Sequence, residues 1–226
     1  MKTLLITTSL LDSVSWCRIA PNTPCKYNPS LTWKEQAYTD LKNTLARIWV
    51  PGNKAVERGQ AFETAIFSKT ATREGVLYKA SDKFKTVVDM CRGGVPQVKS
   101  RTFLAVDDVE YCIFGKLDVD LPALDTIIDI KTTQEYKGQS KYLGSMQHKV
   151  YCYAQRRKNF KYIVAVFNGE TDLEIQELHE VNYTMLDRNA VGDEIEDSIR
   201  KTVSFLKEFD GPGELWDLYQ NTFTKY

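Results

Sequence analysis

The sequence has no long hydrophobic run, since none of its segments approaches the ~18 consecutive apolar residues that a membrane-spanning helix needs. It also has no excess of charge of one sign, because its 30 Lys and Arg residues balance its 30 Asp and Glu residues. This balance excludes a uniformly basic coat for nucleic acid but is compatible with a local basic surface. With 42% hydrophobic and 27% charged residues, the composition is typical of a folded globular chain and excludes a disordered one.

A recognisable cysteine pattern is also missing. The five cysteines are odd in number and no two of them form a CxxC pair, which argues against a zinc ribbon or a redox dithiol. Near the amino terminus, Thr7, Thr8 and Ser9 interrupt the apolar residues and no small-x-small cleavage site follows, so a secretory signal is not expected. We therefore expect a soluble, cytoplasmic protein with reduced thiols and no membrane partner.

Helical and strand periodicities alternate along the chain. Helices are expected at residues 33–49, after the turn at 51–53, at 82–90, at 140–157, and after a capping box formed by Thr184 and Asp187. Strands are expected at residues 98–106 and 111–119, joined by the turn Asp107-Asp108, and at 126–132, 162–167 and 173–181. The order predicts an α/β fold with a central mixed β-sheet flanked by helices. We expect a single domain over residues 1–226, with a helical entry segment at 1–53, a core at 54–182, and a helix and tail at 183–226.

Two acidic residues and a lysine fall on neighbouring predicted strands. Alternate side chains of a strand share a face, so Asp129 and Lys131 project together. If Asp118 lies on the adjacent strand, its carboxylate can lie beside that of Asp129. Clustered carboxylates repel one another unless a cation lies between them, and oxygen ligands of this kind select Mg²⁺ or Mn²⁺. A lysine there can orient water and stabilise charge on a phosphate oxygen, so the pattern predicts metal-assisted phosphodiester hydrolysis.

Neither acidic motif is specific when taken alone. Asp40-Leu41-Lys42 matches the same DxK pattern inside an expected helix, and Asp120 shares a strand face with Asp118. Charged side chains that are merely solvated on a strand would give the same sequence pattern. A structural α/β protein in which the matches are coincidental therefore stays open as an alternative.

Two further features lie in expected helices. Glu63 follows Gly59 by one helical turn and leans over it, which would admit a metal or a closely packed strand. Gln147 and Tyr151 are four residues apart and share a helix face, from which an amide and a phenol can hydrogen-bond phosphate or water near the lysine. An ordinary exposed glutamate and the polar edge of an amphipathic helix are the respective alternatives.

In this order, Glu63, Asp118, Asp129-x-Lys131 and Gln147-x-x-x-Tyr151 resemble the motifs of the PD-(D/E)XK nuclease superfamily over roughly residues 54–168. The similarity is greatest to its RecB-type and phage (lambda-type) exonuclease branches, and it implies a restriction-endonuclease-like core. It also implies that Glu63, Asp118 and Asp129 are metal ligands, together with the carbonyl of Ile130. Catalytic roles would fall to Lys131, Asp118, Asp129, Gln147 and Tyr151.

The resemblance also bears on cofactors. It implies Mg²⁺ or Mn²⁺. Many RecB-type members carry a histidine where Glu63 stands, and a glutamate there is closer to the phage exonuclease pattern. Some relatives bind an iron–sulfur cluster through one upstream and three carboxy-terminal cysteines. No cysteine follows Cys152, so no iron–sulfur cluster is expected.

A compact basic stretch follows the expected QxxxY helix. Cations interleaved with aromatic residues suit a groove that tracks a nucleic-acid backbone, and a solvated helix end is the alternative. The residues expected to bind nucleic acid are Lys149, Arg156, Arg157, Lys158 and Lys161.

Together these features predict a metal-dependent deoxyribonuclease, acting as an exonuclease in phage or bacterial recombination or repair. DNA is the expected partner, and self-association and a single-strand-annealing recombination protein are further partners that this interpretation allows. The alternative is a non-catalytic DNA-binding or assembly module on the same fold. The intact set of Asp118, Asp129 and Lys131 argues against that module, which has no need for a cation site.

Overall fold

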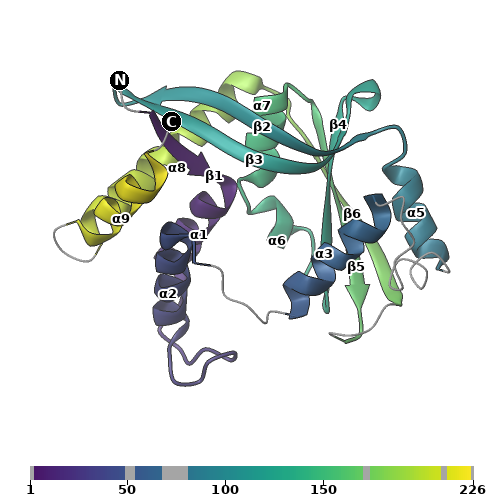
Figure 1. The fold of residues 1–226 in the computed structure, drawn as a ribbon, viewed down its shortest axis with the longest axis horizontal. Helices are drawn as coiled ribbons and strands as arrows, with labels where there is room; N and C mark the ends of the chain where they lie inside the picture. The colour runs from purple at the N-terminus through teal and green to yellow at the C-terminus, as the bar shows by residue number, and fades with distance from the viewer. Residues whose placement is uncertain (1–2, 49–53, 68–80, 170–173, 210–212, 225–226) are drawn as a thin grey trace. The chain divides into compact units, whose positions relative to one another are not determined.

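The structure is a computed structural model that describes residues 3–48, 54–67, 81–169, 174–209 and 213–224 (Figure 1). The turn predicted at 51–53 and the predicted helix end at Trp49 lie outside these ranges. In the described chain, six strands form one mixed sheet in the order β1-β3-β4-β5-β6, with β2 paired to β3. The strands are β1 (Thr3–Thr7), β2 (Val95–Val106), β3 (Val109–Leu121), β4 (Thr126–Thr133), β5 (Asn159–Phe167) and β6 (Ile175–Thr184).

Helices precede, interrupt and follow this sheet along the chain. They are α1 (Thr8–Ile19), α2 (Trp33–Ala46), α3 (Lys54–Phe67), α5 (Asp82–Met90), α6 (Ser140–Leu143), α7 (Gln147–Gln155), α8 (Arg188–Glu208) and α9 (Glu214–Phe223), with a short 3-10 turn at Pro122–Leu124. The predicted fold class, a mixed sheet flanked by helices, is confirmed. Within the described ranges, no helix has the length and hydropathy that crossing a bilayer requires.

The chain divides into two compact units. The first comprises residues 1–49, 100–115 and 187–226, and the second comprises residues 50–99 and 116–186. The predicted boundaries at residues 53 and 182 remain a prediction.

In the first unit, β1 runs parallel to the start of β3, with Leu5 opposite Cys112. Helix α2 begins with a capping box between Thr32 and Glu35, which satisfies amide groups that a helix start leaves unpaired. The fully buried Tyr219 of α9 donates a hydrogen bond from its hydroxyl to the carbonyl of Leu5 over 2.8 Å. The carboxy-terminal helix is therefore part of the core of this unit.

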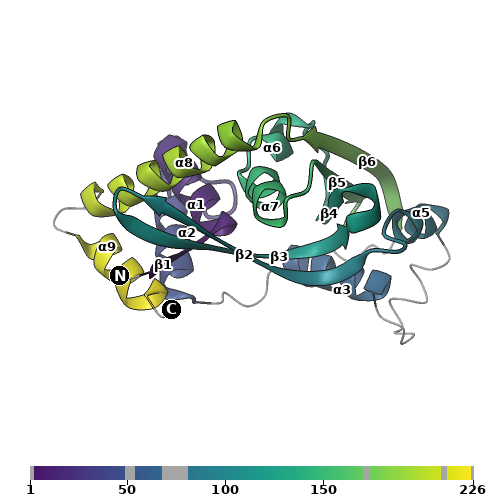
Figure 2. The ribbon, with the colours of Figure 1, turned by 90° about the horizontal axis from the view of Figure 1, so that it is seen from above.

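The second unit contains all the predicted metal and catalytic residues. Its strands form a mixed arrangement, since β3–β4 and β5–β6 are antiparallel and β4–β5 is parallel. Ile128 and Ile130 of β4 pack in a hydrophobic core with Phe62 of α3 and Phe84 of α5. Helix α7 lies on the other side of the strands from α3 (Figure 2). The odd-numbered residues of β4, beginning with Asp129, therefore face away from this core.

Two local predictions were wrong. The helix expected at 140–157 is split into α6 and α7, and the Ser145 hydroxyl accepts the amide hydrogen of Gln147 over 3.0 Å. Gly144 and Ser145 are poor helix residues, because glycine is flexible and serine competes for backbone hydrogen bonds. The predicted capping box at Thr184 is absent: Thr184 ends β6, and Asp187 alone caps α8.

Candidate active site

The site forms where β3 and β4 separate. Their antiparallel pairing ends at Val119 and Ile128, so Asp118 and Asp129 are the next residues on the two strands. The Oδ2 atom of Asp118 accepts the amide hydrogen of Ile130 over 2.7 Å. A carboxylate oxygen thus takes the place of a strand carbonyl, and the two carboxylates come to the same point of the sheet.

Asp129 is the most buried acid of the site, with 2% of its surface exposed. Its Oδ1 accepts a hydrogen bond from the side-chain amide of Gln147 over 2.6 Å, and its Oδ2 lies 2.7 Å from Nζ of Lys131. Among the described residues, Oδ2 nevertheless lacks a donor with hydrogen-bond geometry. We treat the lysine contact as an ion pair, because attraction between charges depends on distance more than on direction. Lone pairs of Oδ2 therefore remain available to a further ligand.

Glu63 approaches the site from α3. It is partly buried, and its Oε2 accepts a weak hydrogen bond from the side-chain amide of Gln97 over 3.4 Å. A Cβ atom placed on Gly59 would lie 3.3 Å from the Thr132 hydroxyl, which is a tight contact. The glycine thus permits close packing of α3 against β4, the second of the two arrangements that its spacing predicted.

Two of the three carboxylates have a raised pKa. Burial, followed by the charges of Asp129 and Glu63, raises the pKa of Asp118 to about 8, although the amide of Ile130 and the charge of Lys131 oppose the rise. Burial and the charge of Asp129 likewise raise the pKa of Glu63. Burial lowers the pKa of Lys131, but the charge and hydrogen bond of Asp129, together with Asp118 and Tyr151, more than offset this and the net shift is upward. The lysine is therefore an ammonium ion at neutral pH.

The acids suit a hard divalent cation in type and charge, but they do not form a closed cage. No group of three acid, histidine or cysteine side chains within the described ranges is close enough to hold a metal. The fit rests instead on the oxygen donors, on their mutual repulsion and on the buried Oδ2 of Asp129 without a hydrogen-bond donor.

The structure separates Asp118 from its competitor Asp120. The carboxylate of Asp120 is buried and accepts two hydrogen bonds from the guanidinium of Arg157, over 2.7 and 2.9 Å. Both carboxylate oxygens of Asp120 are therefore bound by Arg157. The same pair leaves the side chain of Arg157 only 22% exposed, with its guanidinium bound to a carboxylate, and its contact with nucleic acid stays a prediction.

The other predicted nucleic-acid residues differ in their surroundings. Lys161 of β5 forms an ion pair with Glu180 of β6 over 2.5 Å. Lys149 is partly buried, whereas Arg156 and Lys158 are exposed at the end of α7. Nucleic-acid binding by the predicted basic stretch stays a prediction.

The two members of the QxxxY motif contact protein groups. Gln147 holds Asp129, as described above, and the Tyr151 hydroxyl donates to the carbonyl of Lys116 over 3.3 Å. Gln147 thus holds a carboxylate of β4, and Tyr151 contacts the strand that carries Asp118. The predicted contact of this motif with phosphate or water stays a prediction.

Two residues near the acids were missed by the sequence analysis. Gln97 bonds Glu63 from β2, in a left-handed conformation with φ 56° that no local pattern indicated. Lys116 is exposed, and its positive charge lowers the pKa of Glu63. Lys116 lies two residues before Asp118, on the same face of a predicted strand, so its position was available as a signal.

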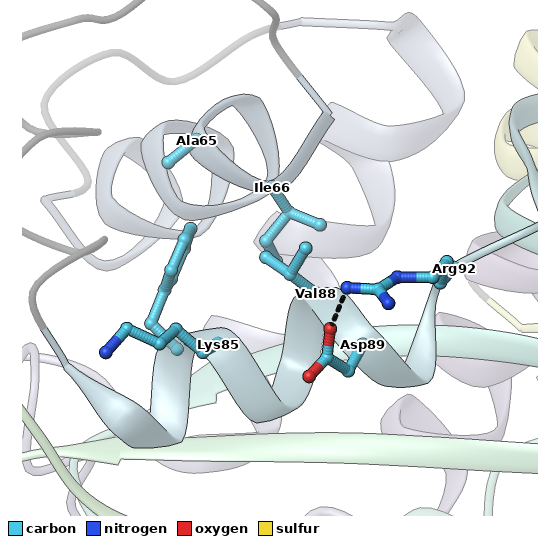
Figure 3. A pocket seen from close by; sticks show the side chains of 7 residues that line it. Ala65, Ile66, Lys85, Val88, Asp89 and Arg92 are labelled. Atoms are coloured by element: carbon cyan, nitrogen blue, oxygen red, sulfur yellow. Dashed lines mark hydrogen bonds and ion pairs between the residues drawn. The ribbon is translucent and has the colours of Figure 1, made fainter.

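A cavity of about 380 Å³ lies elsewhere in the second unit, between α3 and α5. Figure 3 shows its apolar wall at Ala65, Ile66 and Val88, and the ion pair between Asp89 and Arg92 at its edge. None of the predicted metal or catalytic residues lines it. The cavity is therefore separate from the candidate site.

No protein-family model and no curated protein matches the sequence. Among solved structures, the fold is similar to a phage-related exonuclease from Haemophilus somnus 129PT, with 15% identity, a TM-score of 0.50, and 90% of this chain and 93% of that chain covered. It is also similar to SSO0001, with 15% identity, a TM-score of 0.48, and 98% of this chain and 86% of that chain covered. A third similar structure is an alkaline exonuclease from Laribacter hongkongensis, with 12% identity, a TM-score of 0.46, and 96% of this chain and 90% of that chain covered.

Of these three, the Haemophilus somnus structure alone reaches a TM-score of 0.50. At 15% identity, this likeness shows that the fold is similar. This likeness agrees with the predicted fold class, a central mixed β-sheet flanked by helices.

The two aspartates of β3 should respond oppositely to loss of charge. Asp118→Asn removes a carboxylate that two others repel but keeps an oxygen for the amide of Ile130. Asp120→Asn leaves the guanidinium of Arg157 without its counter-charge. In EDTA at pH 8, we expect the first change to raise the unfolding free energy by on the order of 1 kcal/mol, and the second to lower it by roughly 3 kcal/mol.

The pH dependence gives the control. A folded-state pKa of about 8 for Asp118 lies above its value of ~4 in an unfolded chain, so the metal-free protein should lose stability as pH rises between these values. Asp118→Asn should lose this part of the dependence. Urea unfolding at several pH values measures both effects, and equal destabilisation by the two substitutions would contradict the assignment.

Proposed function

We propose that the chain is a nuclease that hydrolyses DNA phosphodiester bonds with the help of Mg²⁺ or Mn²⁺. The observation that carries this proposal is the convergence of Asp118, Asp129 and Lys131 where β3 and β4 separate. Buried like charges with an adjacent ammonium are costly for a purely structural role, and they match the requirements of phosphate chemistry.

The metal would be held by Asp118, Asp129 and Glu63, with the carbonyl of Ile130 as a further oxygen. When bound, such a cation supplies a water of lowered pKa and neutralises negative charge on the phosphate. Gln147 fixes the orientation of Asp129 through Oδ1 and leaves Oδ2 toward the site. Lys131 remains protonated and 38% exposed, so its ammonium can contact a phosphate oxygen and stabilise the charge that develops there.

The exposed cations of the second unit would contact the DNA backbone. Lys116, Arg156 and Lys158 are exposed, and phosphate contacts of this kind carry no base information. The described chain contains no helix-turn-helix or zinc module that would read bases. We therefore propose cleavage without sequence preference.

Action from DNA ends is supported by the motif resemblance and by the fold that the chain shares with the phage-related exonuclease from Haemophilus somnus. A role in phage or bacterial recombination, self-association, and a single-strand-annealing partner follow from the same resemblance. We place the protein in the cytoplasm, because its five cysteines are free and buried, as is usual in a reducing compartment.

The second candidate function is a non-catalytic DNA-binding or assembly module. It is favoured by the absence of a three-ligand metal group from the described residues. The two candidates differ in what they require of Lys131, since a module needs its charge at most for affinity.

Lys131→Ala should reduce cleavage at least 10³-fold while changing DNA affinity less than about 3-fold, because the lysine acts on the transition state and outer cations supply affinity. Lys85→Ala is the matched control: this lysine of α5 is 59% exposed in an ion pair with Asp82, and cleavage should not change. Single-turnover rates with Mg²⁺, and binding measured with Ca²⁺, test both. Full activity of Lys131→Ala would remove the lysine from the mechanism.

Cleavage should also need a DNA end. We expect a linear duplex to be degraded progressively in Mg²⁺, while the same DNA as a covalently closed circle persists. Gel analysis at matched concentrations makes the comparison. Discrete fragments from the circle would instead identify a sequence-defined endonuclease.

A further inference from the structure

Tyr142 lies in α6, on the path from β4 to α7. It is 6% exposed, and its ring stacks on that of Tyr136 with a centroid separation of 6.0 Å and packs on that of Tyr162 at 5.6 Å. In the ladder between β4 and β5, Tyr162 is the direct partner of Asp129. The ring of Tyr142 is therefore held against a residue that neighbours the most buried acid of the site.

The hydroxyl of Tyr142 is buried and has no hydrogen-bond partner among the described residues. An unpaired buried hydroxyl costs about 1–3 kcal/mol, and buried tyrosine hydroxyls usually have a partner. A phenylalanine would make the same ring contacts without this cost. The packing of α6 thus explains the ring and leaves the hydroxyl unexplained.

Two cations lie near the ring of Tyr142. Nζ of the exposed Lys141 is 5.6 Å from the ring centroid, and Lys131 pairs with Val164, two residues from Tyr162 on the same strand face. Burial and Tyr136 raise the pKa of Tyr142, and the positive charge of Lys131 opposes that rise, so the phenol lies within electrostatic reach of the ammonium. The phenol is consequently neutral at neutral pH and retains its proton to donate. An ammonium has no lone pair to accept that proton. Two neighbouring donors suit an anionic acceptor with more than one oxygen.

We propose that Tyr142 binds the substrate, and that its hydroxyl donates a hydrogen bond to a non-bridging oxygen of the phosphodiester that Lys131 also contacts. This inference rests on the proposed nuclease function and adds a phosphate-binding residue outside the predicted motif set. Contacts with Tyr136 and Tyr162 hold the ring before substrate arrives, so little ordering is needed on binding.

Tyr142→Phe removes only the oxygen atom. We expect kcat/KM for DNA to fall about 10- to 100-fold, the usual effect of losing a hydrogen bond to a charged group. The melting temperature in EDTA should stay equal or rise, because the hydroxyl has no partner in the fold. Tyr136→Phe is the matched control, since it removes a hydroxyl from the adjacent ring of the same stack, and it should change kcat/KM less than about 2-fold.

Phosphorothioate substrates distinguish direct contact from an indirect effect. With sulfur in place of the contacted oxygen, one diastereomer should be cleaved more slowly than the normal substrate by the wild-type protein. Tyr142→Phe should show a smaller penalty for that diastereomer, because the hydrogen bond is already gone. Unchanged penalties for both diastereomers, wild-type kcat/KM, or a lowered melting temperature would each overturn the inference. Wild-type protein without cleavage would instead overturn the proposed function itself.

Discussion

Repulsion between carboxylates brought together at the end of a strand pair is the constraint on which the rest of this site depends. Asp118 and Asp129 follow the last paired residues of β3 and β4, and Glu63 adds a third negative charge from α3. Neighbouring donor groups compensate part of this negative charge. An amide of Ile130 binds one acid, while the amide of Gln147 and the ammonium of Lys131 bind the other. What these partners leave uncompensated is the basis for proposing a cation.

The same constraint explains why the two faces of β4 carry different kinds of side chain. Ile128 and Ile130 anchor the strand in the core with α3 and α5, and Asp129 and Lys131 face the opposite side. A strand fixed on one face can hold charged groups on the other with little freedom. Such rigidity is what electrostatic stabilisation of a reacting phosphate requires. The fold that supplies it is shared with a phage-related exonuclease, whereas the activity must be argued from the residues of the site.

Periodicity predicted much of this arrangement. Alternation along β4 correctly separated Ile128 and Ile130 from Asp129, and the limits of α5 were predicted to the residue. Periodicity could not predict which distant residues pair with one another. A run of basic residues has the same sequence whether its side chains are solvated or paired with acids. The hydrogen bond from Arg157 to Asp120 therefore could not be predicted. The orphan hydroxyl of Tyr142 was equally invisible, because burial without a partner is a property of packing.

The central claim is that Asp118 and Asp129 together hold a divalent cation, and Mn²⁺ can be located directly. Crystals soaked with Mn²⁺ should give an anomalous difference peak at a coordination distance of about 2.0–2.6 Å from carboxylate oxygens of both residues. The side chain of Asp118 should turn at least one oxygen toward the peak. A manganese peak elsewhere, with Asp118 still bonded to the amide of Ile130 and Asp129 to Gln147 and Lys131 alone, would contradict the claim.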